Sequence, residues 1–245
     1  MTMLGALRDL ASEQDCYLCG CTTSRPVCAQ CVIALPTLPA GLCPGCALPG
    51  AAGSTCGRCL SNPPHYDATI AAFAYADPLD QGLQAFKYHH ALGLSRFLAA
   101  LLDGAIDAAD AATTAAARAA GHARQVDLIV PMPLSRDRLA ERGFNQALEL
   151  ALPIATRRRI RLDTGVATRT HNTPPQAALP WKERARNIKG AFACKAAIDG
   201  LHIAVVDDVM TTGATLDELA RVLKAAGAVR VTNWVVARTL PHASI

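Results

Sequence analysis

The chain has 245 residues, of which 51% are hydrophobic and 18% are charged, so it can bury a packed core and is not expected to be disordered. Aromatic residues make up only 4%, which argues against a surface that binds bases mainly by stacking. The formal net charge of the whole chain is +4.

The sequence predicts no membrane span. The first sixteen residues contain four charged side chains and no apolar segment of the kind found in export signals. The charge-free segment 29–57 contains four prolines and five glycines, which a membrane helix does not tolerate. We therefore expect a cytoplasmic protein.

Eight cysteines near the start of the chain form four Cys-x-x-Cys pairs, separated by eight, eleven and nine residues. Two thiolates three positions apart can bind one zinc ion, and a second pair completes a tetrahedral site. The sequence therefore predicts two structural zinc ions, whose ligands pair either sequentially or in an interleaved order. The predicted ligands are Cys16, Cys19, Cys28, Cys31, Cys43, Cys46, Cys56 and Cys59.

A disulfide framework or a redox role is the alternative for these cysteines, and a reducing compartment disfavours it. Residues 1–62, the predicted double zinc ribbon, carry three arginines and three acidic residues. A region without net positive charge is poorly suited to binding phosphates. We therefore favour a structural or protein-contact role for this region over nucleic-acid binding.

After a Pro-Pro break at residues 63–64, strand-like and helix-like segments alternate. This alternation is typical of a parallel sheet with helices on both faces, so we predict an α/β domain over residues 66–245. The expected strands are 67–76, 127–131, 160–166, 191–195, 202–207 and 229–236. The expected helices include 92–120, 145–158 and 215–226, and segment 171–190 is expected to form a long loop.

The segment Ile203–Thr215 combines a buried strand with polar side chains that can bind a ligand. Four apolar residues precede Asp207 and Asp208, which we expect at the carboxyl end of the strand, where α/β sheets bind ligands. The residues that follow lead into a helix, whose first N–H groups suit a phosphate. A sugar phosphate satisfies both features, whereas the alternative is that the acids only cap a helix. The predicted phosphate loop consists of Thr211, Thr212, Gly213, Ala214 and Thr215.

This segment resembles the phosphoribosyl diphosphate (PRPP) signature of type I phosphoribosyltransferases. The resemblance implies that Asp207 and Asp208 form the catalytic site by holding the ribose hydroxyls, and that the phosphate loop binds the 5-phosphate. It also implies that Mg²⁺ accompanies PRPP. Thr211 stands where purine-salvage members have an aspartate, which counts against hypoxanthine-guanine salvage.

Further motifs extend the resemblance over essentially the whole chain. Val130–Ser135 is similar to the pyrophosphate-binding loop of amidophosphoribosyltransferase-like members. Together with the Cys pairs, the chain resembles the ComF family, which joins a double zinc ribbon to a phosphoribosyltransferase domain and is linked to DNA uptake in competent bacteria. The residues expected to meet the diphosphate are Lys87, Arg136, Arg138 and Arg142. Other matching residues are Gly143, Phe144, Asn145, Gln146, Arg169, Thr173, Gln176, Arg184, Asn187 and 190–192.

Positive charge is concentrated in residues 134–195, where thirteen Lys and Arg stand against five acids, a net charge of +8. We interpret this region as a diphosphate clamp that could extend into a track for a nucleic-acid backbone. Residues 157–161 have a simpler alternative, a solvated helix end.

Two functions follow from the resemblance. The first is a phosphoribosyltransferase, a member of the glycosyltransferase class, with an unidentified acceptor. The alternative is a non-catalytic protein that senses PRPP or nucleotides and binds single-stranded DNA. In either case DNA-uptake or recombination proteins are the expected partners of the zinc ribbon.

Overall fold

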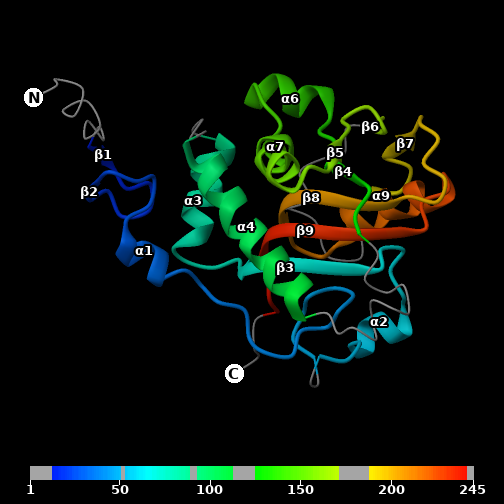
Figure 1. Cartoon of the computed structure of the whole chain (residues 1–245), viewed down its shortest axis with the longest axis horizontal. Coiled ribbons are helices and arrows are strands. Elements are labelled where there is room, and N and C mark those ends of the chain that lie inside the picture. The colour runs from blue at the N-terminus through cyan, green and yellow to red at the C-terminus, as the bar shows by residue number, and fades with distance from the viewer. Residues whose placement is uncertain (1–12, 51–52, 89–92, 113–124, 171–187, 242–245) are drawn as a thin grey trace, which may run out of the picture.

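The computed structural model describes most of the chain, namely residues 13–50, 53–88, 93–112, 125–170 and 188–241. Its centre is a five-stranded sheet in which every neighbouring pair is parallel (Figure 1). The strand order is β3-β9-β8-β4-β5, so β8 lies in the middle. The strands are β3 (Ala68–Ala74), β4 (Leu128–Pro131), β5 (Arg161–Leu162), β8 (His202–Met210) and β9 (Arg230–Arg238).

Side chains of the central strand β8 alternate between two buried clusters. Ile203 and Val205 belong to one cluster, and Ala204 and Val206 belong to the other, as the two-residue period of a strand requires. All four are fully buried. The expectation of a strand covered on both faces is therefore confirmed.

Helices pack on both faces of the sheet. α4 (Gly93–Ala112) and α7 (Gln146–Arg158) pack on one face, and α9 (Ala214–Ala225) packs on the other. α3 (Leu79–Tyr88) packs beside α4. The predicted α/β class is therefore confirmed, although α4 was expected to continue to residue 120, in a segment that lies outside the described residues.

Two strand predictions need correction. Segment 191–195 was expected in the parallel sheet, but β7 (Phe192–Cys194) pairs antiparallel with β6 (Ala167–Arg169) in a separate two-stranded sheet. The predicted strand 160–166 is reduced to β5, because Asp163 accepts a hydrogen bond from the N–H of Gly165 at 2.8 Å and turns the chain. Most of the predicted loop 171–190 lies outside the described residues.

The N-terminal region contains two small Cys-rich modules, which lie at opposite sides of the view in Figure 1. The first Cys module, residues 14–33, contains β1 (Gln14–Asp15), β2 (Thr22–Thr23) and α1 (Ala29–Ile33). The second Cys module, residues 43–61, contains α2 (Gly57–Ser61).

Each Cys module joins a different hydrophobic cluster of the core. Cys16 and Cys31 of the first module pack in the cluster that contains α3 and α4. Cys43 and Cys46 of the second module pack in the cluster that contains α9. The modules are thus attached to opposite faces of the sheet, and the division into domains 1–62 and 66–245 stays a prediction.

Candidate functional site

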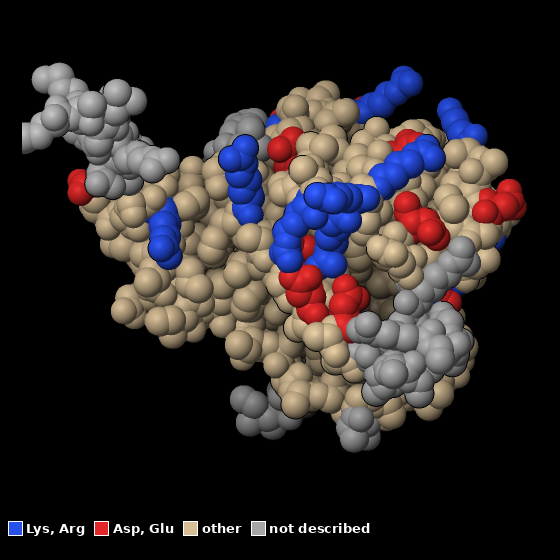
Figure 2. Space-filling model, viewed as in Figure 1, with Lys and Arg blue, Asp and Glu red and all other residues tan. Residues whose placement is uncertain are grey.

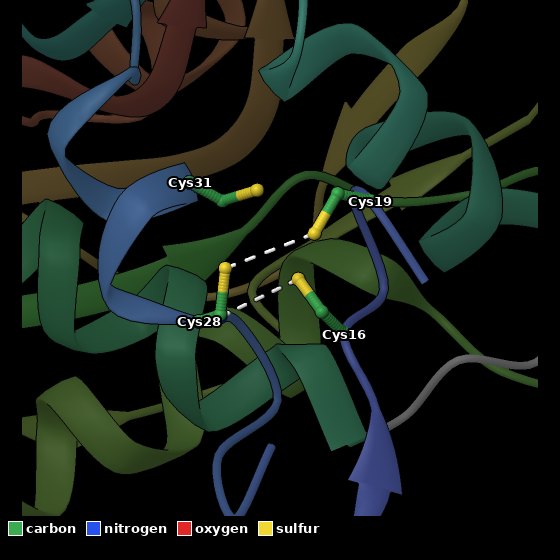
Figure 3. A group of neighbouring side chains, drawn as sticks. All are labelled: Cys16, Cys19, Cys28 and Cys31. Atoms are coloured by element: carbon green, nitrogen blue, oxygen red, sulfur yellow. Dashed lines mark hydrogen bonds between the residues drawn. The ribbon is translucent and has the colours of Figure 1, made fainter. Parts of the chain in front are cut away.

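Both predicted zinc sites are formed by consecutive Cys-x-x-Cys pairs. The sulfur atoms of each group lie within 4.8 Å of one another, and Figure 3 shows those of the first group pointing toward a common centre. The sequential arrangement resolves the pairing that the sequence left open. The first group is Cys16, Cys19, Cys28 and Cys31, and the second is Cys43, Cys46, Cys56 and Cys59.

The backbone around each group prepares thiolates for a metal. The N–H of Cys28 donates to Sγ of Cys16 at 3.4 Å, and the N–H of Cys56 donates to Sγ of Cys43 at 3.3 Å. Burial alone would raise the pKa of the Cys43 thiol, but the surrounding N–H groups outweigh it and lower the pKa to about 6. Four such sulfurs fit one tetrahedral Zn²⁺, and none of the ten cysteines, all of which are described, forms a disulfide.

A second candidate site lies where the connections of the parallel sheet diverge. β4 and β8 are neighbours. The chain leaves β4 through α6 (Arg136–Arg142) and α7 toward β5, whereas it leaves β8 through α9 toward β9 on the opposite side. In open α/β sheets, ligands bind at the carboxyl ends of strands at such a switch point.

Asp207 and Asp208 lie at this switch point, within β8 rather than after it. Pairing of β8 with β4 ends at Val206, but pairing with β9 continues to Met210, so the strand extends through both acids. Nζ of Lys87, near the end of α3, lies 2.8 Å from Oδ2 of Asp208. The structure therefore brings Lys87 directly to the acids.

Burial and charge make this acidic pair electrostatically sensitive. Burial, together with the neighbouring charge of Asp208, raises the pKa of Asp207 to about 8. Burial works against the charge of Lys87, but the Asp208 carboxylate outweighs it and raises the pKa of Lys87. A cation that binds the Asp207 carboxylate would therefore favour loss of its proton.

The phosphate loop connects β8 to α9. Gly213 precedes the first residue of α9 with a φ of 85°, a conformation that favours glycine. Gly213 has no side chain to cap the helix, but the N–H of Ala214 donates to Oγ1 of Thr212 at 3.3 Å. The N-terminus of a helix favours an anion. The loop follows the acids closely in sequence, and its ability to bind a phosphate stays a prediction.

Three of the predicted diphosphate residues are on α6, a helix that the sequence analysis did not predict. Nη2 of Arg142 donates to the hydroxyl of Tyr88 at 3.3 Å, and its guanidinium lies 5.0 Å from the centre of the Tyr88 ring. Arg142 therefore contacts Tyr88, the residue that follows Lys87 in α3. Arg136 is exposed at the start of the helix and faces a neighbouring groove.

Arg169 is a cation near the acids that was not among the predicted diphosphate residues. It lies on β6, 5.6 Å over the Phe192 ring. Burial and the charge of Arg138 lower the pKa of Arg169, while the charge of Asp207 acts in the opposite direction. Its match to the ComF motifs was the only sequence signal for this position.

Figure 2 shows basic and acidic side chains gathered side by side near the middle of one face of the molecule. Not all of the basic segment contributes to such a site. Arg157 forms ion pairs with Asp103 and Asp107, and Arg158 pairs with Asp103, with Asp107 at 2.7 Å and with Asp110 at 3.2 Å. These two arginines hold α7 to α4. Arg158 is largely buried, so the expected solvated helix end does not describe it, and its charge is neutralised within the fold.

A groove of about 970 Å³ lies beside the chain segment that follows β4. The segment 133–137, the start of α7 and β6 form its walls. Three basic side chains, Arg136, Arg169 and Lys195, line it together with two acidic ones, Asp137 and Glu149. The predicted matching residues Thr173, Gln176, Arg184 and Asn187 lie outside the described residues.

Comparison with known proteins identifies two groups of relatives. The chain is 34% identical over 229 residues to the DNA utilization protein YhgH of Salmonella typhimurium, covering 92% of this chain and 97% of that protein. It is 32% identical over 189 residues to competence protein F of Haemophilus influenzae, covering 75% of this chain and 78% of that protein. No protein-family model matches the chain.

Among solved structures, a purine phosphoribosyltransferase from Pyrococcus horikoshii matches 57% of this chain and 90% of its own. The sequence identity is 18% and the TM-score is 0.28, which is too low to establish a common overall fold.

None of the described helices is both long and apolar enough to cross a membrane.

Proposed function

This chain belongs to the ComF family, and we propose that it binds Mg²⁺-PRPP at the switch point between β4 and β8. The observation that supports this proposal most directly is the 2.8 Å contact between Lys87 and Asp208. This contact brings Lys87 to the acids that precede the phosphate loop, although 121 positions separate Lys87 and Asp208 in the sequence.

In the proposed complex, different groups around the switch point bind different parts of PRPP. Asp207 and Asp208 accept hydrogen bonds from the ribose hydroxyls, and N–H groups of the phosphate loop donate to the 5-phosphate. Lys87, Arg142 and the nearby Arg169 supply positive charge for the diphosphate. Carboxylate oxygens are ligands that suit Mg²⁺, which when bound would neutralise part of the diphosphate charge.

We propose that the reaction is transfer of ribose 5-phosphate to an acceptor nucleophile. The bond between the anomeric carbon and the diphosphate breaks, and a bond to the acceptor forms. Positive charge develops on the sugar near Asp207 and Asp208, and negative charge develops on the diphosphate near the cations. Catalysis by this site would therefore be electrostatic.

Titration of the zinc-loaded protein with Mg²⁺-PRPP, followed by a pyrophosphate-release assay, tests both parts of the proposal. Saturable binding supports the ligand. Pyrophosphate release that depends on an added nucleobase or amine supports the transferase, whereas binding without release supports the non-catalytic alternative. A protein that does not bind Mg²⁺-PRPP at all would contradict the proposal.

The groove beside β4 favours a second candidate function, binding of single-stranded DNA. Its basic side chains Arg136 and Lys195 could contact backbone phosphates, and the names of the relatives refer to DNA utilization and competence. Binding of a labelled oligonucleotide should then weaken with salt. Replacing both residues with alanine should lower the log–log salt slope by about 0.7 per lost contact. An unchanged slope would remove the groove from this function.

Protein partners of the Cys modules stay a prediction. The first Cys module exposes 79% of Ile33, and exposed apolar side chains are common in contact surfaces. DNA-uptake or recombination proteins remain the partners that we propose for it.

A further inference from the structure

We propose that the second Cys module positions the phosphate loop, through Arg58 and Arg238, so that the conformation of the loop depends on the metal group of this module. The effect on ligand affinity rests on the proposed binding of Mg²⁺-PRPP. The effect on the loop itself does not, and it can be measured without any ligand.

Arg58 is the first link between the module and the loop. It lies on α2 between Cys56 and Cys59, two members of the second sulfur group. Nη2 of Arg58 donates to the backbone carbonyl of Thr212 at 2.9 Å. Because the flanking cysteines would both bind the same ion, the metal fixes the backbone from which Arg58 reaches the loop.

Arg238 is the second link, and it is buried. Only 1% of this residue is exposed, at the end of β9. Its Nε donates to the carbonyl of Cys46 at 2.8 Å, and its Nη1 donates to the carbonyl of Met210 at 2.9 Å and also to that of Thr211. One guanidinium therefore joins a residue of the sulfur group to the first part of the loop.

Side chains also pack closely against Gly213 in the phosphate loop. A Cβ at this position would lie 2.7 Å from Cε of Met210 and 3.1 Å from the hydroxyl of Tyr66. Tyr66 is 4% exposed and belongs to the same hydrophobic cluster as Cys43 and Cys46. Hydrogen bonds to the carbonyls of Met210, at the end of β8, and of the loop residues Thr211 and Thr212 thus come from the second Cys module and its immediate neighbours, as does a close side-chain wall.

These contacts use carbonyl oxygens, so they do not occupy N–H groups of the loop. Arg58 and Arg238 also place two positive charges behind the loop, which favours a negatively charged ligand on its other side. The inference therefore assigns both residues a positioning role, since neither needs to touch the ligand.

Hydrogen exchange of the full-length, zinc-loaded protein tests the inference without a ligand. In the variant Arg58→Ala, amides in the peptide spanning 209–217 should exchange about tenfold faster than in the wild type. Arg58→Lys keeps a donor and should restore much of the protection. Arg25→Ala is the matched control, because Arg25 is an exposed arginine between two cysteines of the first Cys module.

The metal can be tested in the same way. Cys56→Ser should accelerate exchange in peptide 209–217, whereas Cys19→Ser should accelerate exchange in the first Cys module and leave this peptide unchanged. Wild-type exchange of the peptide in both Arg58→Ala and Cys56→Ser would overturn the inference.

Calorimetric titration with Mg²⁺-PRPP tests the consequence for binding. Arg58→Ala should weaken affinity about tenfold at an unchanged melting temperature, and Arg58→Lys should recover most of it. Wild-type affinity in Arg58→Ala would overturn the link to binding. If the wild type itself fails to bind Mg²⁺-PRPP, the proposed function is wrong, and the exchange experiments alone decide whether the module positions the loop.

Discussion

The two Cys modules have nearly the same local geometry but different surroundings. In the first, Sγ of Cys19 lies 3.7 Å from Sγ of Cys28, and in the second, Sγ of Cys46 lies 3.6 Å from Sγ of Cys56. Yet Cys19 is exposed, whereas Cys46 is fully buried. The same four-cysteine arrangement therefore occurs once with an exposed cysteine and once with a cysteine buried in the core.

The surroundings also connect the modules to different parts of the candidate site. A Cβ at Gly82 on α3 would lie 2.8 Å from the Leu18 side chain, so the first Cys module packs closely against the helix that carries Lys87. The second Cys module hydrogen-bonds to the phosphate loop through Arg58. A repeated metal unit can thus act on two ends of one site, and the comparison predicts different consequences when each metal is lost.

The largest expected effect is loss of one metal group. The wild type should contain about two zinc ions, and Cys19→Ser or Cys43→Ser should each retain about one, because three thiolates no longer close a structural site. Metal analysis of protein purified without chelators measures this. Cys43→Ser should also lower the melting temperature more, because it lies in the core. Zinc-free wild-type protein would contradict the metal assignment.

An intermediate effect is expected when the candidate site loses Lys87, the cation on α3. Lys87→Ala should weaken Mg²⁺-PRPP binding about tenfold, because it removes a positive charge beside the acids. Arg96→Ala, an exposed arginine on α4, removes the same charge away from the acids and should have little effect. Equal affinities of the two variants would mean that Lys87 does not face the ligand.

The smallest expected effect is the pH dependence of binding. The pKa of Asp207 is raised to about 8, and the proposed ligand takes the ionised carboxylate, so affinity should rise severalfold as pH increases through about 8 and level off above about pH 9. Asp207 also faces Asp208, Lys87 and Arg169. Titrations at several pH values measure the trend, and Asp207→Asn should show a flatter profile. Identical profiles would exclude Asp207 as the titrating group.

The same raised pKa has a consequence for stability. The folded chain retains a proton on Asp207 that the unfolded chain releases at its ordinary, lower pKa. The contribution of Asp207 to the free energy of unfolding should therefore fall as pH rises from about 4 to about 8, and Asp207→Asn should remove this contribution.

The sequence predicted the chemistry of both sites better than their arrangement. Cys spacing predicted the eight cysteines that form two groups able to hold zinc, but the separations between pairs allow sequential and interleaved pairing alike. Asp207 and Asp208 lie at the carboxyl-end side of the sheet, as expected, and their role in ligand binding stays a prediction; β8 extends beyond them because β9 continues to pair. A single strand carries no information about how far its neighbours run.

Other features had no usable local signal. β7 was assigned to the parallel sheet because the sequence of a three-residue strand does not reveal which strand pairs with it or in which direction. In the structure, β7 pairs antiparallel with β6. Arg58 and Arg238 reach the phosphate loop from 154 and 27 or 28 positions away. Such contacts arise from tertiary packing, so neither residue stands out in the sequence.

The central claim is that Asp207 and Asp208 hold the ribose of PRPP. Calorimetric titration of Mg²⁺-PRPP into the wild type and the Asp207→Asn/Asp208→Asn variant, with melting temperatures measured alongside, tests it most directly. We predict affinity roughly ten- to a hundredfold weaker in the variant, because the substitutions preserve shape and remove charge and acceptor oxygens. The variant should still fold, with a lower melting temperature because Lys87 loses the charge of its partner Asp208, so the titration is run well below that temperature. The acids lie within β8 and Gly213 is the N-cap of α9, so they do not cap this helix. Wild-type affinity in the variant would contradict the claim that they hold ribose.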